Sequence, residues 1–132
     1  MGAEPYKYIV DYEENIQKAL DKLRERVFKS GDFHSLIDKP KTIEDAVIGA
    51  DADGTRSILD INLISAEPDF CQAAPFKSEN LLKYFGTEKP TLEMIENRDT
   101  FWENIERGHA RYIILYEKDM PKKIFFAGYS FD

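Results

Sequence analysis

Cysteine and long apolar runs are what this sequence lacks most clearly. Cys71 is the single cysteine, which excludes an intramolecular disulfide and any zinc site built from several thiolates. We therefore expect a protein of the reducing cytoplasm. The longest apolar runs, near Tyr112–Tyr116 and Ile124–Gly128, are far too short to cross a bilayer, so no membrane partner is expected.

Glycine, proline and positive charge are also in short supply. Only 7 glycines and 6 prolines occur among 132 residues, and the 42% hydrophobic content excludes a disordered chain. This length predicts one globular domain over residues 1–132, with residues 1–4 flexible. The 18 basic and 25 acidic residues give a net charge of −7, which repels phosphate backbones and argues against a nucleic-acid partner. An acidic surface suits a protein partner instead.

The first third of the chain carries the strongest periodic pattern. Tyr6–Asp11 is aromatic and β-branched and predicts a strand. Asp11 followed by Glu14 predicts a capping box, and Ser30-Gly31 predicts the end of the helix that follows. Apolar residues recur along one face of this predicted helix at Ile16, Ala19, Leu20, Leu23 and Val27.

The remaining segments predict short helices and a terminal hairpin. Arg111–Tyr116 and Lys123–Tyr129 are β-rich and nearly continuous in apolar residues, so we expect a β-hairpin in the middle of a sheet. Ser57–Ser65 alternates and favours a strand, although a helix also fits, and residues 67–75 suggest a loop. Short helices are predicted at residues 42–50, 79–85, 90–95 and 99–107. The fold class is α+β.

Asp51-Ala-Asp53-Gly54-Thr55 is the one motif that suggests catalysis. With the apolar residues 46–50 before it, it resembles the first motif of haloacid dehalogenase-type phosphatases. That resemblance implies that Asp51 is the nucleophile, Asp53 the acid/base, and magnesium the cofactor. The alternative is that residues 42–50 form a helix and that Asp-Gly makes the turn that ends it. We favour the turn. Asp51 and Asp53 are therefore catalytic candidates only under the phosphatase hypothesis, and no other catalytic residue is assigned.

Cysteine and histidine provide little further chemistry. Nucleophilic catalysis by Cys71 needs an adjacent histidine, and only His34 and His109 exist. Two histidines among scattered carboxylates do not form a metal-ligand spacing, so no metal site is predicted. The simpler interpretation of Cys71 is a small buried hydrophobic residue.

Three further segments carry a common pattern: Ala19–Glu25, the run Gly54-Thr55-Arg56-Ser57-Ile58-Leu59-Asp60-Ile61, and the closing Phe126-Ala127-Gly128-Tyr129-Ser130-Phe131-Asp132. Together they resemble a family of small bacterial proteins. The resemblance implies a shared architecture and brings no activity or cofactor with it. Arg56, Asp60 and Tyr129 are the candidate binding residues, with Arg56 expected to pair with Asp60 or another acid.

Three functions are compatible with these patterns. The favoured one is a non-catalytic protein-interaction or regulatory module that binds a protein partner or itself and needs no cofactor. One alternative is a magnesium-dependent phosphoryl-transfer or hydrolytic enzyme that uses Asp51 and Asp53. The other is a small-molecule sensor whose pocket is lined by aromatic residues of the terminal hairpin.

Overall fold

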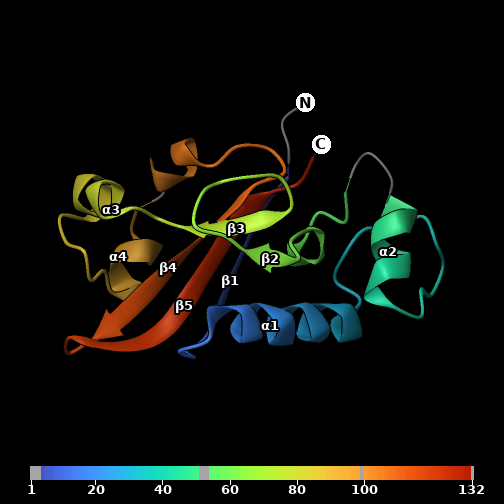
Figure 1. Cartoon of the computed structure of the whole chain (residues 1–132), viewed down its shortest axis with the longest axis horizontal. Helices are drawn as coiled ribbons and strands as arrows, with labels where there is room; N and C mark the ends of the chain where they lie inside the picture. The colour runs from blue at the N-terminus through green and yellow to red at the C-terminus, as the bar shows by residue number, and fades with distance from the viewer. Residues whose placement is uncertain (1–3, 51–53, 99, 132) are drawn as a thin grey trace.

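A computed structural model describes residues 4–50, 54–98 and 100–131 (Figure 1). In these ranges five strands form one sheet in the order β1-β5-β4-β3-β2, which confirms the α+β class. The elements are β1 (Pro5–Asp11), α1 (Ile16–Ser30), α2 (Ile43–Ala50), η2 (Ile58–Asp60), β2 (Leu63–Ile64), β3 (Gln72–Pro75), α3 (Ser78–Phe85), α4 (Leu92–Glu96), η3 (Thr100–Asn104), β4 (Ala110–Glu117) and β5 (Met120–Tyr129), where η denotes a 3-10 helix.

The sheet is mixed, and the predicted hairpin occupies its middle. β5 pairs antiparallel with β1 on one side and with β4 on the other. β4, β3 and β2 run parallel to one another. The two long strands β4 and β5 therefore form the centre, while β1 and β2 lie at the two edges (Figure 1).

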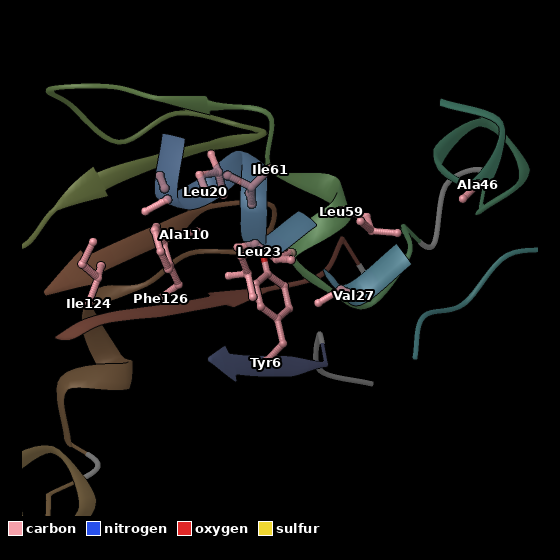
Figure 2. Packing of buried hydrophobic residues seen from close by; sticks show 13 residues of the cluster. Tyr6, Leu20, Leu23, Val27, Ala46, Leu59, Ile61, Ala110, Ile124 and Phe126 are labelled. Carbon is pink, nitrogen blue, oxygen red and sulfur yellow. The ribbon is translucent and has the colours of Figure 1, made fainter. Parts of the chain in front are cut away.

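Each face of the sheet carries its own apolar core because successive side chains of a strand point to opposite faces. Ile124 and Phe126 of β5 pack with Leu20 and Leu23 of α1 on one face. Figure 2 shows the ring of Tyr6 rising from β1 toward Leu23 in this core. On the other face, β5 packs against α3, α4 and η3 through residues that include Phe85, Ile95, Phe101 and Phe125.

The long helix forms as its periodicity predicts, but it begins later than expected. Asn15 is its N-cap, and the Asn15 side chain accepts a hydrogen bond of 3.1 Å from the Lys18 N–H. The capping box predicted at Asp11 is wrong, because Asp11 is the last residue of β1 and pairs with Lys123 of β5. Gly31 ends the helix in the left-handed conformation, as the sequence predicts.

The strand predicted over Ser57–Ser65 is wrong for most of its length. Ser57 instead caps the short helix η2, and only Leu63–Ile64 forms a strand. Alternation was misleading here because Ile58, Leu59 and Ile61 are all buried, which a single strand face cannot achieve. The predicted loop over residues 67–75 contains the strand β3, whose Gln-Ala-Ala-Pro sequence has no β-branched residue to indicate it.

The turn of the hairpin is shorter than the sequence suggests. Lys118 and Asp119 alone join β4 to β5, with φ angles of 51° and 64°. Positive φ at both central positions is the geometry of a type I′ turn, which glycine or asparagine usually provides. Without that signal, the strands were predicted too short at this end.

The helices of the described part of the chain are all too short or too polar to cross a membrane.

Candidate functional site

Asp60 lies in a buried polar network formed by the residues just before it. Its Oδ1 accepts hydrogen bonds from the Thr55 N–H at 2.8 Å and from the Thr55 hydroxyl at 2.9 Å. Thr55 Oγ1 lies 2.8 Å from Ser57 Oγ, and Ser57 Oγ accepts from the Leu59 N–H at 3.2 Å. This network closes residues 54–60 into a compact loop that ends in η2.

Burial dominates the electrostatics of this network. It raises the pKa of Asp60, while the hydrogen bonds from Thr55 and the positive charge of Arg24 partly offset the increase. Burial also raises the pKa of Tyr6, and the charge of Asp60 raises it further. Asp60 Oδ2 and Tyr6 Oη are both buried without a hydrogen-bond partner among the described residues. Asp60 is only 7% exposed and Thr55 is fully buried, so this carboxylate has little contact with solvent.

Arg56 does not extend the network through its side chain. Its side chain is exposed and its backbone has a φ of 56°, a strained value for a residue with a Cβ. The guanidinium that acts on Asp60 belongs to Arg24, whose Nη2 donates 2.8 Å to the Leu59 carbonyl. Arg56 contributes a backbone hydrogen bond to Asp60, whereas the guanidinium charge near this carboxylate comes from Arg24 of α1.

Cys71 and His109 lie at the ends of the neighbouring strands β3 and β4. The Cys71 N–H donates 2.9 Å to the Gly108 carbonyl. Burial and the nearby carboxylates of Asp60 and Asp69 raise the pKa of the Cys71 thiol, which favours its protonated form over the nucleophilic thiolate. The His109 ring packs edge-to-face against Phe70, with ring centroids 5.0 Å apart.

The catalytic alternative centres on residues that lie outside the described ranges, namely Asp51 and Asp53. The residues before them form the helix α2, whose first turn is capped by the Thr42 hydroxyl at 3.1 Å from the Asp45 nitrogen. The phosphatase motif needs a strand at this point, so α2 fits the turn interpretation. Over the described ranges, no group of three or more His, Cys, Asp or Glu residues could hold a metal ion.

Tyr129 lies on the opposite face of the sheet from Asp60. Its ring meets that of Trp102 edge-to-face, with centroids 5.3 Å apart. The three candidate binding residues are therefore not brought together: Arg56 and Asp60 belong to one loop, whereas Tyr129 belongs to a separate aromatic surface.

This aromatic surface forms an open groove beside β1. One hollow, of about 240 Å³, is lined by residues that include Lys7, Ile9, Glu96 and Trp102. A second, of about 450 Å³, is lined by Pro5, Tyr6, Lys7, Trp102 and Tyr129. The two hollows share Lys7 and Trp102, and we refer to them together as the β1 groove.

The groove borders an open strand edge. The Tyr12 N–H donates 3.1 Å to the Lys122 carbonyl, and the Ser130 N–H donates 2.9 Å to the Glu4 carbonyl. With the β1–β5 register, these bonds show that the even-numbered residues of β1 point their backbone groups at β5. The N–H and C=O groups of Lys7, Ile9 and Asp11 therefore point away from the sheet.

Comparison with protein-family models, with curated proteins and with solved structures found no match. The resemblance to small bacterial proteins stays a prediction, and function has to be inferred from the geometry alone.

Of the residues in this groove, the sequence pointed only to Tyr129. Lys7, Ile9 and Trp102 were missed because their importance depends on which strand occupies the edge of the sheet. The available signal was the alternation in Tyr6–Asp11, in which the charged residues Lys7 and Asp11 stand at odd positions and Tyr6, Tyr8 and Val10 at even ones.

Proposed function

We propose that this protein is a non-catalytic interaction module that binds an extended polypeptide segment along β1. The observation that carries the proposal is the row of outward-pointing backbone groups at Lys7, Ile9 and Asp11 beside the β1 groove. A strand added to such an edge gains main-chain hydrogen bonds, and hollows beside it select alternate side chains. The groove supplies such hollows, bordered by the Trp102 and Tyr129 rings.

The chemistry elsewhere in the described chain supports binding more than catalysis. Asp60 is buried and committed to Thr55, and the Cys71 thiol stays protonated. The groove holds Arg98 together with the rings of Trp102 and Tyr129, and arginine and aromatic residues are enriched at protein interfaces. These features favour recognition of a polypeptide by shape and backbone hydrogen bonding.

The test is selection of seven-residue peptides from a random display library, followed by hydrogen exchange with a selected peptide. In the free protein, the amides of Lys7, Ile9 and Asp11 should exchange fast, whereas those of Tyr6 and Val10 are already bonded to β5. Bound peptide should protect the three odd-numbered amides. Because the chain has one tryptophan, the fluorescence of Trp102 should report the same event.

A backbone substitution makes this test specific. Ile9→Pro removes the central N–H of the free edge, which edge strands tolerate because the lost group faces away from the sheet. Selected peptides should bind this variant at least about tenfold more weakly, the equivalent of one hydrogen-bonded contact. Ile9→Val keeps the N–H and should bind as the wild type does. Equal binding to both variants, or protection of other amides, would contradict the proposal.

A small-molecule sensor is the second candidate, favoured by the hollow between Trp102 and Tyr129. Small aromatic compounds would then change Trp102 fluorescence and leave the exchange of the Ile9 amide unaltered. Protection of that amide by peptides excludes this alternative as the main use of the groove.

A further inference from the structure

We propose that the segment bound along β1 is the β1 strand of a second copy of this chain, which produces a two-fold symmetric dimer with a continuous sheet. This inference rests on the proposed function, because it assigns an occupant to the same strand edge. The new element is the sequence of the edge itself, which is complementary to its own antiparallel copy.

The complementarity follows from the register that symmetry allows. When two β1 strands pair antiparallel about Ile9, Ile9 faces Ile9, and Lys7 faces Asp11 of the second copy at both ends. Pairing about Lys7 or about Asp11 would place like charges opposite each other. Only the register centred on Ile9 therefore pairs both charges favourably.

The backbone supports the same register. Lys7, Ile9 and Asp11 all present their N–H and C=O groups at the free edge, so each opposed pair can exchange two hydrogen bonds. The paired strands would gain about six main-chain hydrogen bonds. Sliding one strand by a single residue along the other would oppose an outward-pointing backbone to an inward-pointing one and lose these bonds. Registers centred on Tyr8 or Val10 would keep the bonds, but they would not place Lys7 opposite Asp11.

The side chains are distributed to suit this contact on both faces. On the α1 face, the half-buried Tyr8 and Val10 would lie opposite each other across the interface and extend the apolar core. On the groove face, Ile9 is 38% exposed and would be covered by its counterpart. Partial exposure of these three apolar residues in one copy is what the second copy removes.

The charges on this edge normally keep strands apart. A lysine on an edge strand opposes association because it cannot be buried without a partner. Here Asp11 occupies the symmetric position, and its side chain is 88% exposed although it pairs with Lys123. Its carboxylate can therefore accept Lys7 of the second copy as well.

Sedimentation velocity of the full chain over a range of concentrations tests the dimer. The wild type should shift from the monomer mass to twice that mass as concentration rises. Lys7→Glu and Asp11→Lys each oppose two like-charged pairs, and each should raise the dissociation constant at least about tenfold.

Mixing the Lys7→Glu and Asp11→Lys variants is the most specific test of the proposed register. A Lys7→Glu chain paired with an Asp11→Lys chain has opposite charges at both ends of the contact, so the mixture should form a heterodimer more readily than either variant dimerises alone. The double variant Lys7→Glu/Asp11→Lys should also recover dimerisation. Lys41→Glu and Asp38→Lys change the net charge equally at exposed sites away from β1 and should dimerise as the wild type does.

A monomer at all concentrations would overturn this inference, as would single variants that dimerise normally or a mixture that shows no heterodimer. Thermal unfolding of each variant confirms that it is folded before it is compared. The proposed function is tested separately. If the chain is monomeric but still binds selected peptides through the Ile9 amide, the dimer inference is wrong and the proposed function stands. A dimer that persists in Ile9→Pro would overturn the dimer inference alone, because it would have to form away from β1.

Discussion

At the scale of single residues, Asp60 brings a carboxylate into the interior with only one of its oxygens hydrogen-bonded. An ionised group in this situation costs free energy because burial removes its hydration. The loop from Gly54 to Asp60 nevertheless needs an acceptor for the N–H and hydroxyl of Thr55. Asp60 therefore loses part of its hydration, and its hydrogen bonds to Thr55 hold this loop closed.

This trade predicts a pH dependence of stability. Because burial raises the pKa of Asp60, its contribution is fully present below the unfolded-state pKa of about 3.9 and is lost as pH rises through the folded-state pKa. Relative to Asp60→Asn, which does not titrate, the wild type should lose free energy of unfolding as pH rises above the unfolded-state pKa of about 3.9. Urea titrations at several pH values measure this difference. Asp38→Asn, at an exposed site, is the control. A wild type that gains free energy of unfolding relative to Asp60→Asn as pH rises would contradict the assignment.

Glycine at position 54 is required for two separate reasons. Its φ is 75°, and a Cβ there would lie 2.6 Å from Asp60 Oδ2. Gly86 has a φ of 74° with nothing within 4 Å of the same added atom, which makes Gly86→Ala a matched control. We expect Gly86→Ala to cost about 1 kcal/mol in unfolding free energy, for conformation alone. Gly54→Ala should cost at least about 1 kcal/mol more, because it also displaces the carboxylate. Equal losses in chemical denaturation would mean that Asp60 moves aside freely.

At the scale of elements, the start of α1 differs between the sequence prediction, which placed the N-cap at Asp11, and the structure, which has Asn15 there. Asn15→Ala removes the bond to the Lys18 N–H and should lower the free energy of unfolding by about 1 kcal/mol. Asp11→Ala removes only an exposed ion pair and should change it by less than about 0.5 kcal/mol. Both are measured by urea denaturation at low protein concentration. A larger loss for Asp11→Ala would restore the predicted capping box.

The hairpin turn provides a stabilising prediction. Lys118 and Asp119 both adopt positive φ, which costs free energy for side chains with a Cβ. Replacing them with Asn-Gly, the preferred type I′ pair, should raise the unfolding free energy by about 1 kcal/mol. A thermal midpoint that rises by a few degrees checks this, and an unchanged midpoint would mean that the turn is not of type I′.

The sequence predicted those elements that form because of their own local pattern, and it missed those that depend on pairing with distant segments. α1 was predicted because its apolar residues repeat at helical spacing, and β4 and β5 were predicted because their apolar runs are long. β3 was missed because Gln-Ala-Ala-Pro becomes a strand only through its pairing with β4. The β1 groove could not be predicted either, since it is formed by residues of β1, α4, η3 and β5 that meet only in the folded sheet.

At the scale of the whole molecule, the fold has a stable centre and weaker margins. β5 is hydrogen-bonded on both sides and buries side chains in both cores. α2 has two turns, and its fully buried side chains are the small residues Ala46 and Ala50, while Ile48 is 74% exposed. The protection of backbone amides against hydrogen exchange should therefore decrease from β5 toward α2.

Native-state hydrogen exchange measures this gradient. We expect the amides of Ile124 and Phe126 to exchange only through global unfolding, and those of α2 to exchange through local opening at lower free energy. The amides of α1, which packs on the sheet, serve as an internal reference. If α2 exchanged as slowly as β5, the two would unfold as one cooperative unit.

The pairing of β1 with β5 has a consequence for the synthesis of the protein. Ile9 lies opposite Phe125, so the ribosome delivers the neighbour of β1 on the order of ten seconds after β1 itself. Until then, α1 has no sheet to cover the side chains of Leu20 and Leu23. The nascent chain must therefore leave the apolar face of α1 uncovered until β4 and β5 have been synthesised.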